Sequence, residues 1–121
     1  MRRWFFLVSV LLSAAACRPQ IGDKCLTSSE CSPDGREQRT CDTTSPDGYC
    51  TVGSCNIDTC SEEATCVSFQ DDNFRFCMLA CSTNEECRTD SGYECILASA
   101  LPAGTALLDS VAPAGYCGIA P

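Results

Sequence analysis

The first residues of the chain follow the order of an export signal. Residues 1–3 include two arginines, residues 4–12 form an apolar run, and residues 13–16 are small. A positive segment, a short apolar run and a small-residue end are the three parts of a secretory signal peptide. The apolar run is too short for a spanning helix, which needs about 20 residues. We therefore predict that residues 1–16 are a signal peptide that is removed on export.

Beyond the signal, short stretches of β-forming residues are separated by turn residues. Clusters such as Pro46-Asp47-Gly48 and Asp71-Asp72-Asn73 between two β-forming stretches are typical of hairpin turns. The third pair of stretches is separated by a long loop instead. We expect three hairpins, formed by residues 38–43 with 49–52, 65–69 with 74–79, and 93–97 with 116–119.

A spacing of cysteines recurs along the same region. Three Cys-x5-Cys steps occur at residues 25–31, 60–66 and 81–87. Each contains or overlaps a hydroxyl residue followed three positions later by Glu, at Thr27–Glu30, Thr59–Glu62 and Ser82–Glu85. That pattern is a capping-box signature, so it predicts a short helical turn. We therefore expect a disulfide-rich domain over residues 24–121, built of three tandem units over about 22–53, 54–79 and 80–121.

Cysteine content sets the fold class. The chain has 121 residues and 13 cysteines, the level of a small secreted disulfide scaffold. After residue 16, Leu, Ile, Val and Phe make up only about 15%, too little to offset the entropy of ordering the chain. We predict a small disulfide-rich fold of short β-hairpins and helical turns in tandem units, with little regular secondary structure, that collapses on reduction.

Cysteine parity also suggests which residues pair. With Cys17 set aside, twelve cysteines remain, which can close as six bridges. We expect pairing mostly within a unit, for instance among the four cysteines of residues 25–50, although the sequence leaves the connectivity open. The expected disulfide cysteines are Cys25, Cys31, Cys41, Cys50, Cys55, Cys60, Cys66, Cys77, Cys81, Cys87, Cys95 and Cys117.

Charge and composition exclude several classes of function. The formal net charge is -8 and the chain has no histidine. An acidic chain without a basic stripe is a poor nucleic-acid binder, and His-based acid–base or nucleophilic catalysis is ruled out. Oxidised cysteines are not nucleophiles, and the absence of a Cys-x2-Cys pair in an exported chain argues against zinc thiolates. We therefore expect no enzyme, no cofactor and no metal.

The residues around position 17 carry a second signal. The segment 11–17, Leu-Leu-Ser-Ala-Ala-Ala-Cys, resembles the lipobox of bacterial lipoproteins, although Ala14 stands where that family prefers a branched residue. The resemblance implies lipidation of Cys17 and an anchor in the membrane, and Arg18 implies the outer membrane or cell surface. Residues 17–23 would then be the lipidated N-terminus and its tether. Secretion as a soluble protein with an unpaired Cys17 is the other possibility.

The whole mature chain resembles the small cysteine-rich lipoproteins of myxobacteria. The likeness lies in Cys17, in Gly22-Asp23-Lys24-Cys25, in the Cys-x5-Cys steps and in the segment 87–95, Cys-Arg-x-x-x-Gly-Tyr-x-Cys. That group has no shared activity to carry over. A weaker resemblance to EGF-like modules lies in residues 56–60 and Cys66, but the Cys-x-Cys of those modules is missing. It implies a calcium site, for which acidic residues at 62–63 and 71–73 would supply oxygen ligands.

These observations favour a non-catalytic, membrane-anchored structural or interaction module at the cell envelope, with an unknown protein or surface partner. The apolar stretches 101–108 and 111–114 are candidates for the contact surface, or else Ile96, Leu97, Leu107 and Leu108 complete the core. A secreted protease inhibitor is the main alternative, because Arg36 and Arg39 lie in a disulfide-tied loop. A calcium-binding EGF-like module is the other.

Overall fold

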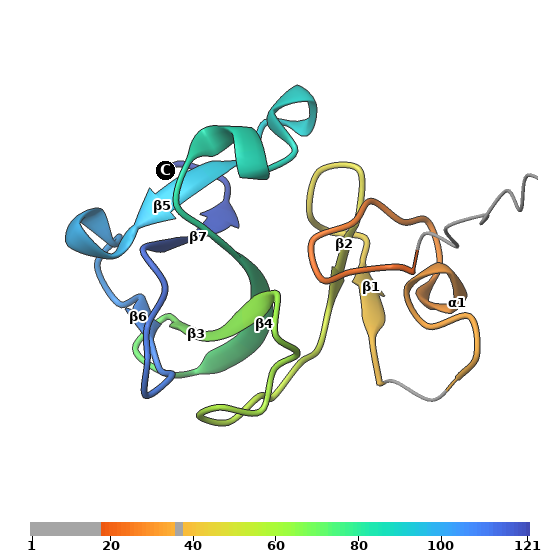
Figure 1. The fold of residues 1–121 in the computed structure, drawn as a ribbon, viewed down its shortest axis with the longest axis horizontal. Helices are drawn as coiled ribbons and strands as arrows, with labels where there is room; N and C mark the ends of the chain where they lie inside the picture. Colours follow the sequence, from red (N-terminus) through yellow and green to blue (C-terminus); the bar gives the residue numbers. More distant parts are fainter. Residues whose placement is uncertain (1–17, 36–37) are drawn as a thin grey trace, which may run out of the picture.

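A computed structural model describes residues 18–35 and 38–121, and these form a small disulfide-rich fold with two sheets (Figure 1). A two-stranded sheet contains β1 (Thr40–Asp42) and β2 (Tyr49–Thr51). The second sheet has five strands in the order β5-β7-β4-β3-β6. Helix is limited to α1 (Ser28–Cys31) and to 3-10 turns at Asn84–Glu86, Thr89–Ser91 and Ala98–Ala100. Within the described residues, no helix has the length and apolar character needed to span a membrane.

All three expected hairpins are confirmed. β1 and β2 pair antiparallel, as do β3 (Ala64–Phe69) and β4 (Phe74–Cys81). The third pair, β5 (Glu94–Leu97) and β7 (Gly115–Gly118), is also antiparallel, although the long loop between them adds the short edge strand β6 (Ala106–Leu107). In every hairpin the register places two cysteines directly opposite each other: Cys41 and Cys50, Cys66 and Cys77, and Cys95 and Cys117.

The six disulfides confirm that cysteines pair within units. In each unit the first cysteine bonds to the third and the second bonds to the fourth. The cysteines that face each other across a hairpin are therefore never bonded to each other, and both are tied to the segment that precedes the hairpin. The bonds are Cys25–Cys41, Cys31–Cys50, Cys55–Cys66, Cys60–Cys77, Cys81–Cys95 and Cys87–Cys117.

The helical turns differ from expectation in two units. In the first unit the expected helical turn is present as α1, which Thr27 precedes and which contains Glu30, although the Thr27 side chain makes no capping hydrogen bond. In the third unit the capping box lies one residue later than predicted, on Thr83 and Glu86. The prediction for Thr59 and Glu62 is wrong, because the Thr59 amide and hydroxyl both donate to the Asn56 carbonyl, at 3.3 and 2.9 Å, and close a turn before Cys60.

The cysteine step of the second unit was therefore assigned to the wrong pair. Cys55 and Cys60 flank the turn that precedes the hairpin, whereas Cys66 lies within β3. The step corresponding to residues 25–31 and 81–87 is 55–60, with four intervening residues instead of five. Equal spacing of cysteines is thus a weaker guide than their position relative to the strands.

The boundaries of the units are less sharp than the spacing suggests. β4 continues through the predicted boundary at residues 79–80 and ends at Cys81. There it pairs with β7 of the third unit, so the second and third units share one sheet. The predicted tether is also too long, because Ile21 is only 1% exposed and packs in the core. The Gly22 amide donates to the Cys50 carbonyl at 2.8 Å, so the fold begins at Ile21.

Sulfur fills much of the core. Nine of the fifteen buried apolar residues are cysteines, and the others are Ile21, Val67, Ile96 and three tyrosines. This composition follows from the scarcity of large aliphatic side chains in the sequence. The disulfides therefore serve both as cross-links and as the main buried apolar material.

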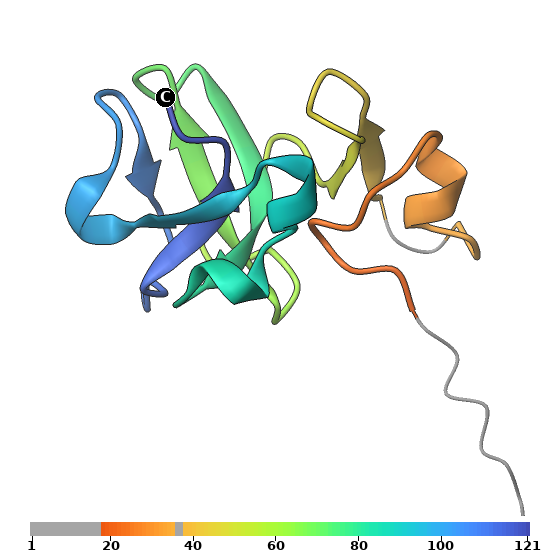
Figure 2. The same ribbon diagram turned by 90° about the horizontal axis from the view of Figure 1, so that it is seen from above.

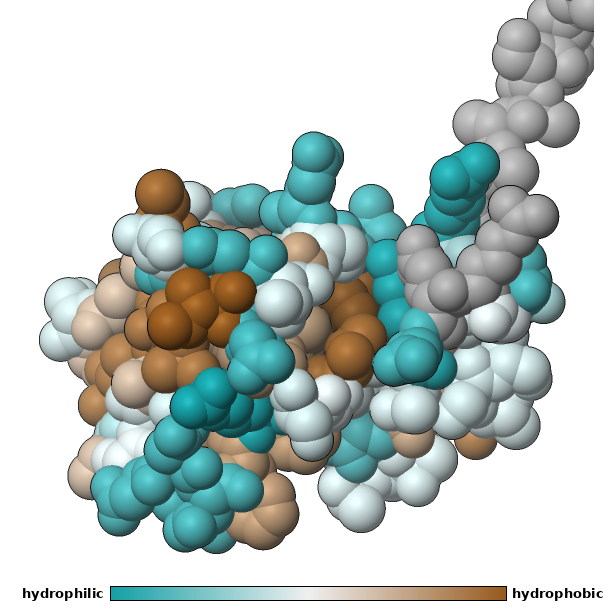
Figure 3. All heavy atoms as spheres, turned by 90° about the horizontal axis from the view of Figure 1, so that it is seen from below, coloured by the Kyte–Doolittle hydropathy of each residue, from teal (hydrophilic) through white to brown (hydrophobic). Residues whose placement is uncertain are grey.

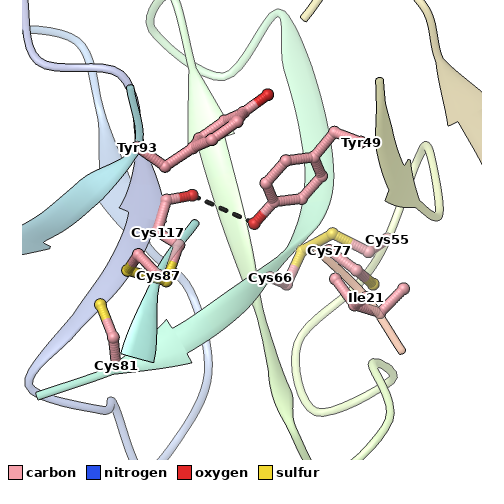
Figure 4. Close-up of a cluster of buried hydrophobic side chains, with 9 residues drawn as sticks. All are labelled: Ile21, Tyr49, Cys55, Cys66, Cys77, Cys81, Cys87, Tyr93 and Cys117. Carbon is pink, nitrogen blue, oxygen red and sulfur yellow. Dashed lines mark hydrogen bonds between the residues drawn. A yellow bond between two sulfur atoms is a disulfide. The ribbon is translucent and has the colours of Figure 1, made fainter. Parts of the chain in front are cut away.

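The hairpin β1–β2 lies beside the five-stranded sheet and is joined to it by buried hydrogen bonds (Figures 1 and 2). The Tyr49 hydroxyl donates to the Cys117 carbonyl at 3.1 Å and accepts from the Leu79 amide at 2.9 Å. Figure 4 shows the Tyr49 ring reaching across the junction, with Tyr93 opposite. The Thr51 hydroxyl donates to the Cys77 carbonyl at 2.7 Å. One tyrosine thus connects the first unit to both of the others.

We predict that Tyr49→Phe lowers the free energy of unfolding by about 1–3 kcal/mol, because it leaves a buried carbonyl and a buried amide without their partner. Urea denaturation with the disulfides intact measures this loss. Tyr116→Phe is the matched control. Burial alone raises the pKa of the Tyr116 hydroxyl, and its removal costs no hydrogen bond to a described residue. Equal stability of the two variants would contradict the role of Tyr49.

A candidate binding groove between the first hairpin and the sheet

A groove of about 420 Å³ lies where the first hairpin meets the sheet. Its volume falls in the range of sites that bind small ligands or short peptide segments. Most of its lining is apolar and much of it aromatic. The lining residues are Asp42, Ser45, Tyr49 and Thr51 from the first unit, Phe69, Gln70, Phe74, Phe76 and Met78 from the second, and Tyr93, Ala103, Thr105 and Ile119 from the third.

The alternation of side chains along β3 and β4 produces the floor of the groove. The register pairs Phe69 with Phe74 and Thr65 with Met78, so these residues share one face of the hairpin. Cys66 and Cys77 point to the other face, where their disulfides attach the preceding segment. The covered face carries the disulfides, and the aromatic face is left to line the groove.

The aromatic side chains of the floor are packed but incompletely covered. Phe69 lies with its ring centroid 6.3 Å from that of Phe76 and 5.9 Å from that of Tyr116, the latter edge-on. Phe74, at the open end, is 50% exposed. Partly exposed aromatic rings held in fixed positions are typical of recognition surfaces.

Tyr49 and Tyr93 form the wall of the groove at the junction. Their ring centroids are 5.3 Å apart, and the Tyr93 hydroxyl donates to the Pro46 carbonyl at 2.8 Å. Arg88 lies against these rings, with its guanidinium carbon 4.6 Å from the Tyr93 centroid. Burial raises the pKa of Tyr93, and the positive charge of Arg88 opposes that rise. The ring is therefore a neutral, fixed surface at ordinary pH.

Arg88 itself is bound by backbone of the first unit and does not line the groove. It donates to the carbonyls of Gly22 and Gly48 and, at 3.1 Å, to the Ser91 hydroxyl. Ser91 in turn donates to Asp47 at 2.8 Å. These bonds hold the third unit against the first and fix the position of the tyrosine wall.

Asp42 is the charged residue among those that line the groove. Its carboxylate accepts from the Thr44 hydroxyl and amide at 2.6 and 2.9 Å and from the Ser45 hydroxyl at 2.7 Å. Partial burial acts to raise the pKa of Asp42, but these hydrogen bonds outweigh it and hold the pKa below its ordinary value of 3.8. A carboxylate that stays ionised thus lies at one side of an aromatic groove.

The apolar residues of the third unit were expected either to form a contact surface or to complete the core, and the structure shows some in each position. Ile96 is buried, and Leu107 and Leu108 are half-buried against the core, but Leu97 and Val111 are exposed, Val111 at 88%. On the face seen in Figure 3, apolar residues gather in patches that hydrophilic residues interrupt.

The same loop is tied to the second unit by side-chain hydrogen bonds. Asp109 accepts from the Thr65 hydroxyl at 2.8 Å and from the Asp58 amide at 2.9 Å. Asp58 accepts from the amide and hydroxyl of Ser110. This clamp places Ala103 and Thr105 along the groove.

Of the two arginines proposed for a protease pocket, Arg39 does not have the required exposure. The Arg39 side chain is 8% exposed, with its guanidinium 3.3 Å from the Glu63 carboxylate, and it also donates to the Pro19 carbonyl. It therefore supports the start of the fold and does not project from a loop. Arg36, together with residues 1–17 and hence the signal peptide and Cys17, lies outside the described residues.

The acidic residues expected to bind calcium are dispersed. Glu63 pairs with Arg39, and Asp72 pairs with Arg75 at 2.7 Å. Within the described ranges, the groups of three side chains close enough to share a metal ion consist of cysteines, and their sulfurs are in disulfides. Residues 62–63 and 71–73 are not brought together as one site.

Comparison with known proteins gives no relative from which a function could be transferred. No family model matches the chain, and neither a curated protein nor a solved structure matches it. The disulfides indicate an exported protein.

The groove is the feature that sequence reasoning missed. In the first strand the alternation of apolar residues is incomplete, because position 65 is Thr and only Val67 and Phe69 are apolar. In the second strand Phe74, Phe76 and Met78 alternate clearly. That alternation predicts one apolar face of the hairpin. Which part of that face becomes a groove depends on the positions of Tyr49 and Tyr93, which come from the other two units.

We predict that Asp42 titrates below 3.8 in the folded protein. Its ionised form then stabilises the fold above that pH, and the contribution is lost as the pH falls through the lowered pKa. The double variant Thr44→Ala/Ser45→Ala raises the pKa of Asp42, because both hydroxyl donors are lost while the effect of burial and the Thr44 amide donor remain. Carboxyl ¹³C NMR titration measures both.

Ser110→Ala is the control, since Ser110 donates to Asp58 and not to Asp42. An Asp42 titration that is unchanged in the double variant would show that these donors do not hold the carboxylate.

Proposed function

We propose that the protein is a non-catalytic, exported lipoprotein that presents a rigid binding groove at the cell envelope. The observation that carries this proposal is the aromatic groove, whose floor and walls come from three disulfide-tied units. Binding sites gain affinity when their side chains are already ordered before the ligand arrives. A module with little apolar core but six disulfides meets that condition.

The groove has features of a binding site, but the residues that line it include no evident pair of catalytic groups. Its one carboxylate, Asp42, is occupied as an acceptor by Thr44 and Ser45. Paired-carboxylate hydrolysis needs a second acid about 5–9 Å away, and the lining residues supply none. The hydroxyls of Tyr49 and Tyr93 both donate to carbonyls, which supports a structural use.

The start of the fold supports a position close to the membrane. Lipidation of Cys17 would leave residues 18–20 between the anchor and the buried Ile21. Four residue steps span at most about 14 Å. The module would therefore lie against the bilayer surface, because no long tether separates it from the lipid. Several acyl chains would make that attachment stable.

We predict that the protein purified from its native membrane begins at Cys17, carries acyl mass and gains twelve hydrogens when its six disulfides are reduced. Intact-mass spectrometry before and after reduction measures all three. Cys17→Ser is the control, and we expect this variant to lose the acyl mass but to keep the gain of twelve hydrogens.

A soluble, unacylated protein would contradict the lipid anchor and favour secretion. In that case inhibition of trypsin-like proteases, through Arg36, and a calcium-dependent change in melting temperature between Ca²⁺ and EDTA become the next assays.

A further inference from the structure

We propose that the groove binds an extended polypeptide segment in which a lysine or arginine is flanked by apolar residues. This inference rests on the proposed function and specifies its ligand. The segment's cation would lie between the aromatic rings and Asp42, and its apolar neighbours would cover the floor formed by Phe69, Phe74 and Phe76.

The rings of the groove suit a cation. Aromatic faces attract ammonium and guanidinium groups within about 6 Å of the ring centroid. The protein already uses its wall this way, because Arg88 lies 4.6 Å from the centroid of Tyr93 and 5.9 Å from that of Tyr49. The partly exposed Phe74 offers a further ring, on the side of the groove open to solvent.

Charge favours the same ligand. Among the residues that the structure describes, Asp42 lies in the lining and no lysine or arginine does. Arg88 lies against the wall rings but outside the lining, with its N–H groups donated to backbone carbonyls. The formal net charge of the chain is -8, so the surrounding field attracts cations as well. The same net charge disfavours a second copy of this chain as the occupant.

Size favours a peptide over a small organic cation. The groove, at about 420 Å³, has the volume of sites that hold drug-sized ligands, so a single quaternary ammonium headgroup would leave much of it unfilled. Gln70 and Thr105 line the groove together with the aromatic floor. Their amide and hydroxyl groups can form hydrogen bonds with the backbone of an extended peptide, while the rings contact its apolar side chains.

The test uses the oxidised protein in an uncharged detergent and two matched peptides, acetyl-Leu-Arg-Leu-amide and the same peptide with neutral citrulline. Binding is followed by amide chemical shifts and by tyrosine fluorescence, and the peptides contain no aromatic residue. We expect the shifts to gather at Thr51, Gln70 and Phe74, and the citrulline peptide to bind about tenfold more weakly.

Two variants separate the groove from the rest of the surface. Phe74→Ser weakens binding of the arginine peptide, and its partial exposure makes loss of the fold unexpected. Ile57→Ser is the matched control, because Ile57 is 55% exposed and does not line the groove. Asp42→Asn brings the affinities for the two peptides close together, in a protein whose amide spectrum confirms that it is folded.

Each other result overturns the inference in a distinct way. Equal binding of both peptides in the groove would remove the preference for a cation but leave the proposed binding function intact. Benzyltrimethylammonium binding as tightly as the arginine peptide would make a small organic cation the ligand. No shift with either peptide at about 1 mM would reject a peptide ligand, whereas the lipid anchor is decided separately by intact mass.

Discussion

The fold depends on an arrangement in which two half-cystines face each other across each hairpin and both bond to the segment before it. Register fixes the facing pairs, for example Cys66 opposite Cys77, and the partners Cys55 and Cys60 lie on either side of a tight turn. Each disulfide closes a loop of between 11 and 30 residues. Loops of this length stabilise a small protein by about 2–4 kcal/mol per bond. Six such bonds compensate for the scarcity of large aliphatic side chains in the core.

The groove is a consequence of where that sulfur lies. In β3 and β4 the cysteines occupy one face, and the preceding segment covers it. The opposite face is thereby left for Phe69, Phe74 and Phe76, and only part of it is closed by Tyr116 and its neighbours. Tyr49 then positions the first hairpin along the open part through its hydrogen bonds to Cys117 and Leu79. One face of the β3–β4 hairpin thus carries the structural cross-links, and the other face carries the partly exposed aromatic surface.

The sequence predicted the elements whose signals are local. Turn residues predicted the three hairpins, and the even number of cysteines after Cys17 predicted six bridges, but which cysteines pair within a unit was left open. It failed where the outcome depended on distant contacts. The middle cysteine step was misplaced because Thr59 closes a turn with Asn56. Ile21 was assigned to a tether because nothing nearby shows that it packs between units. Arg39 was assigned to a recognition loop because its partner Glu63 lies 24 residues away. The groove combines residues of all three units, so no single stretch of sequence could indicate it.

Disulfide mapping tests the central claim most directly. The non-reduced protein is cleaved between cysteines, and the cross-linked peptides are identified by mass spectrometry. We expect the pairs Cys25–Cys41 and Cys31–Cys50 in the first unit and the same first-to-third and second-to-fourth order in the other two. Direct bonds between facing residues, such as Cys66 with Cys77, or bonds between units would contradict it, and the aromatic face of β3 and β4 would then lose the framework that leaves it open.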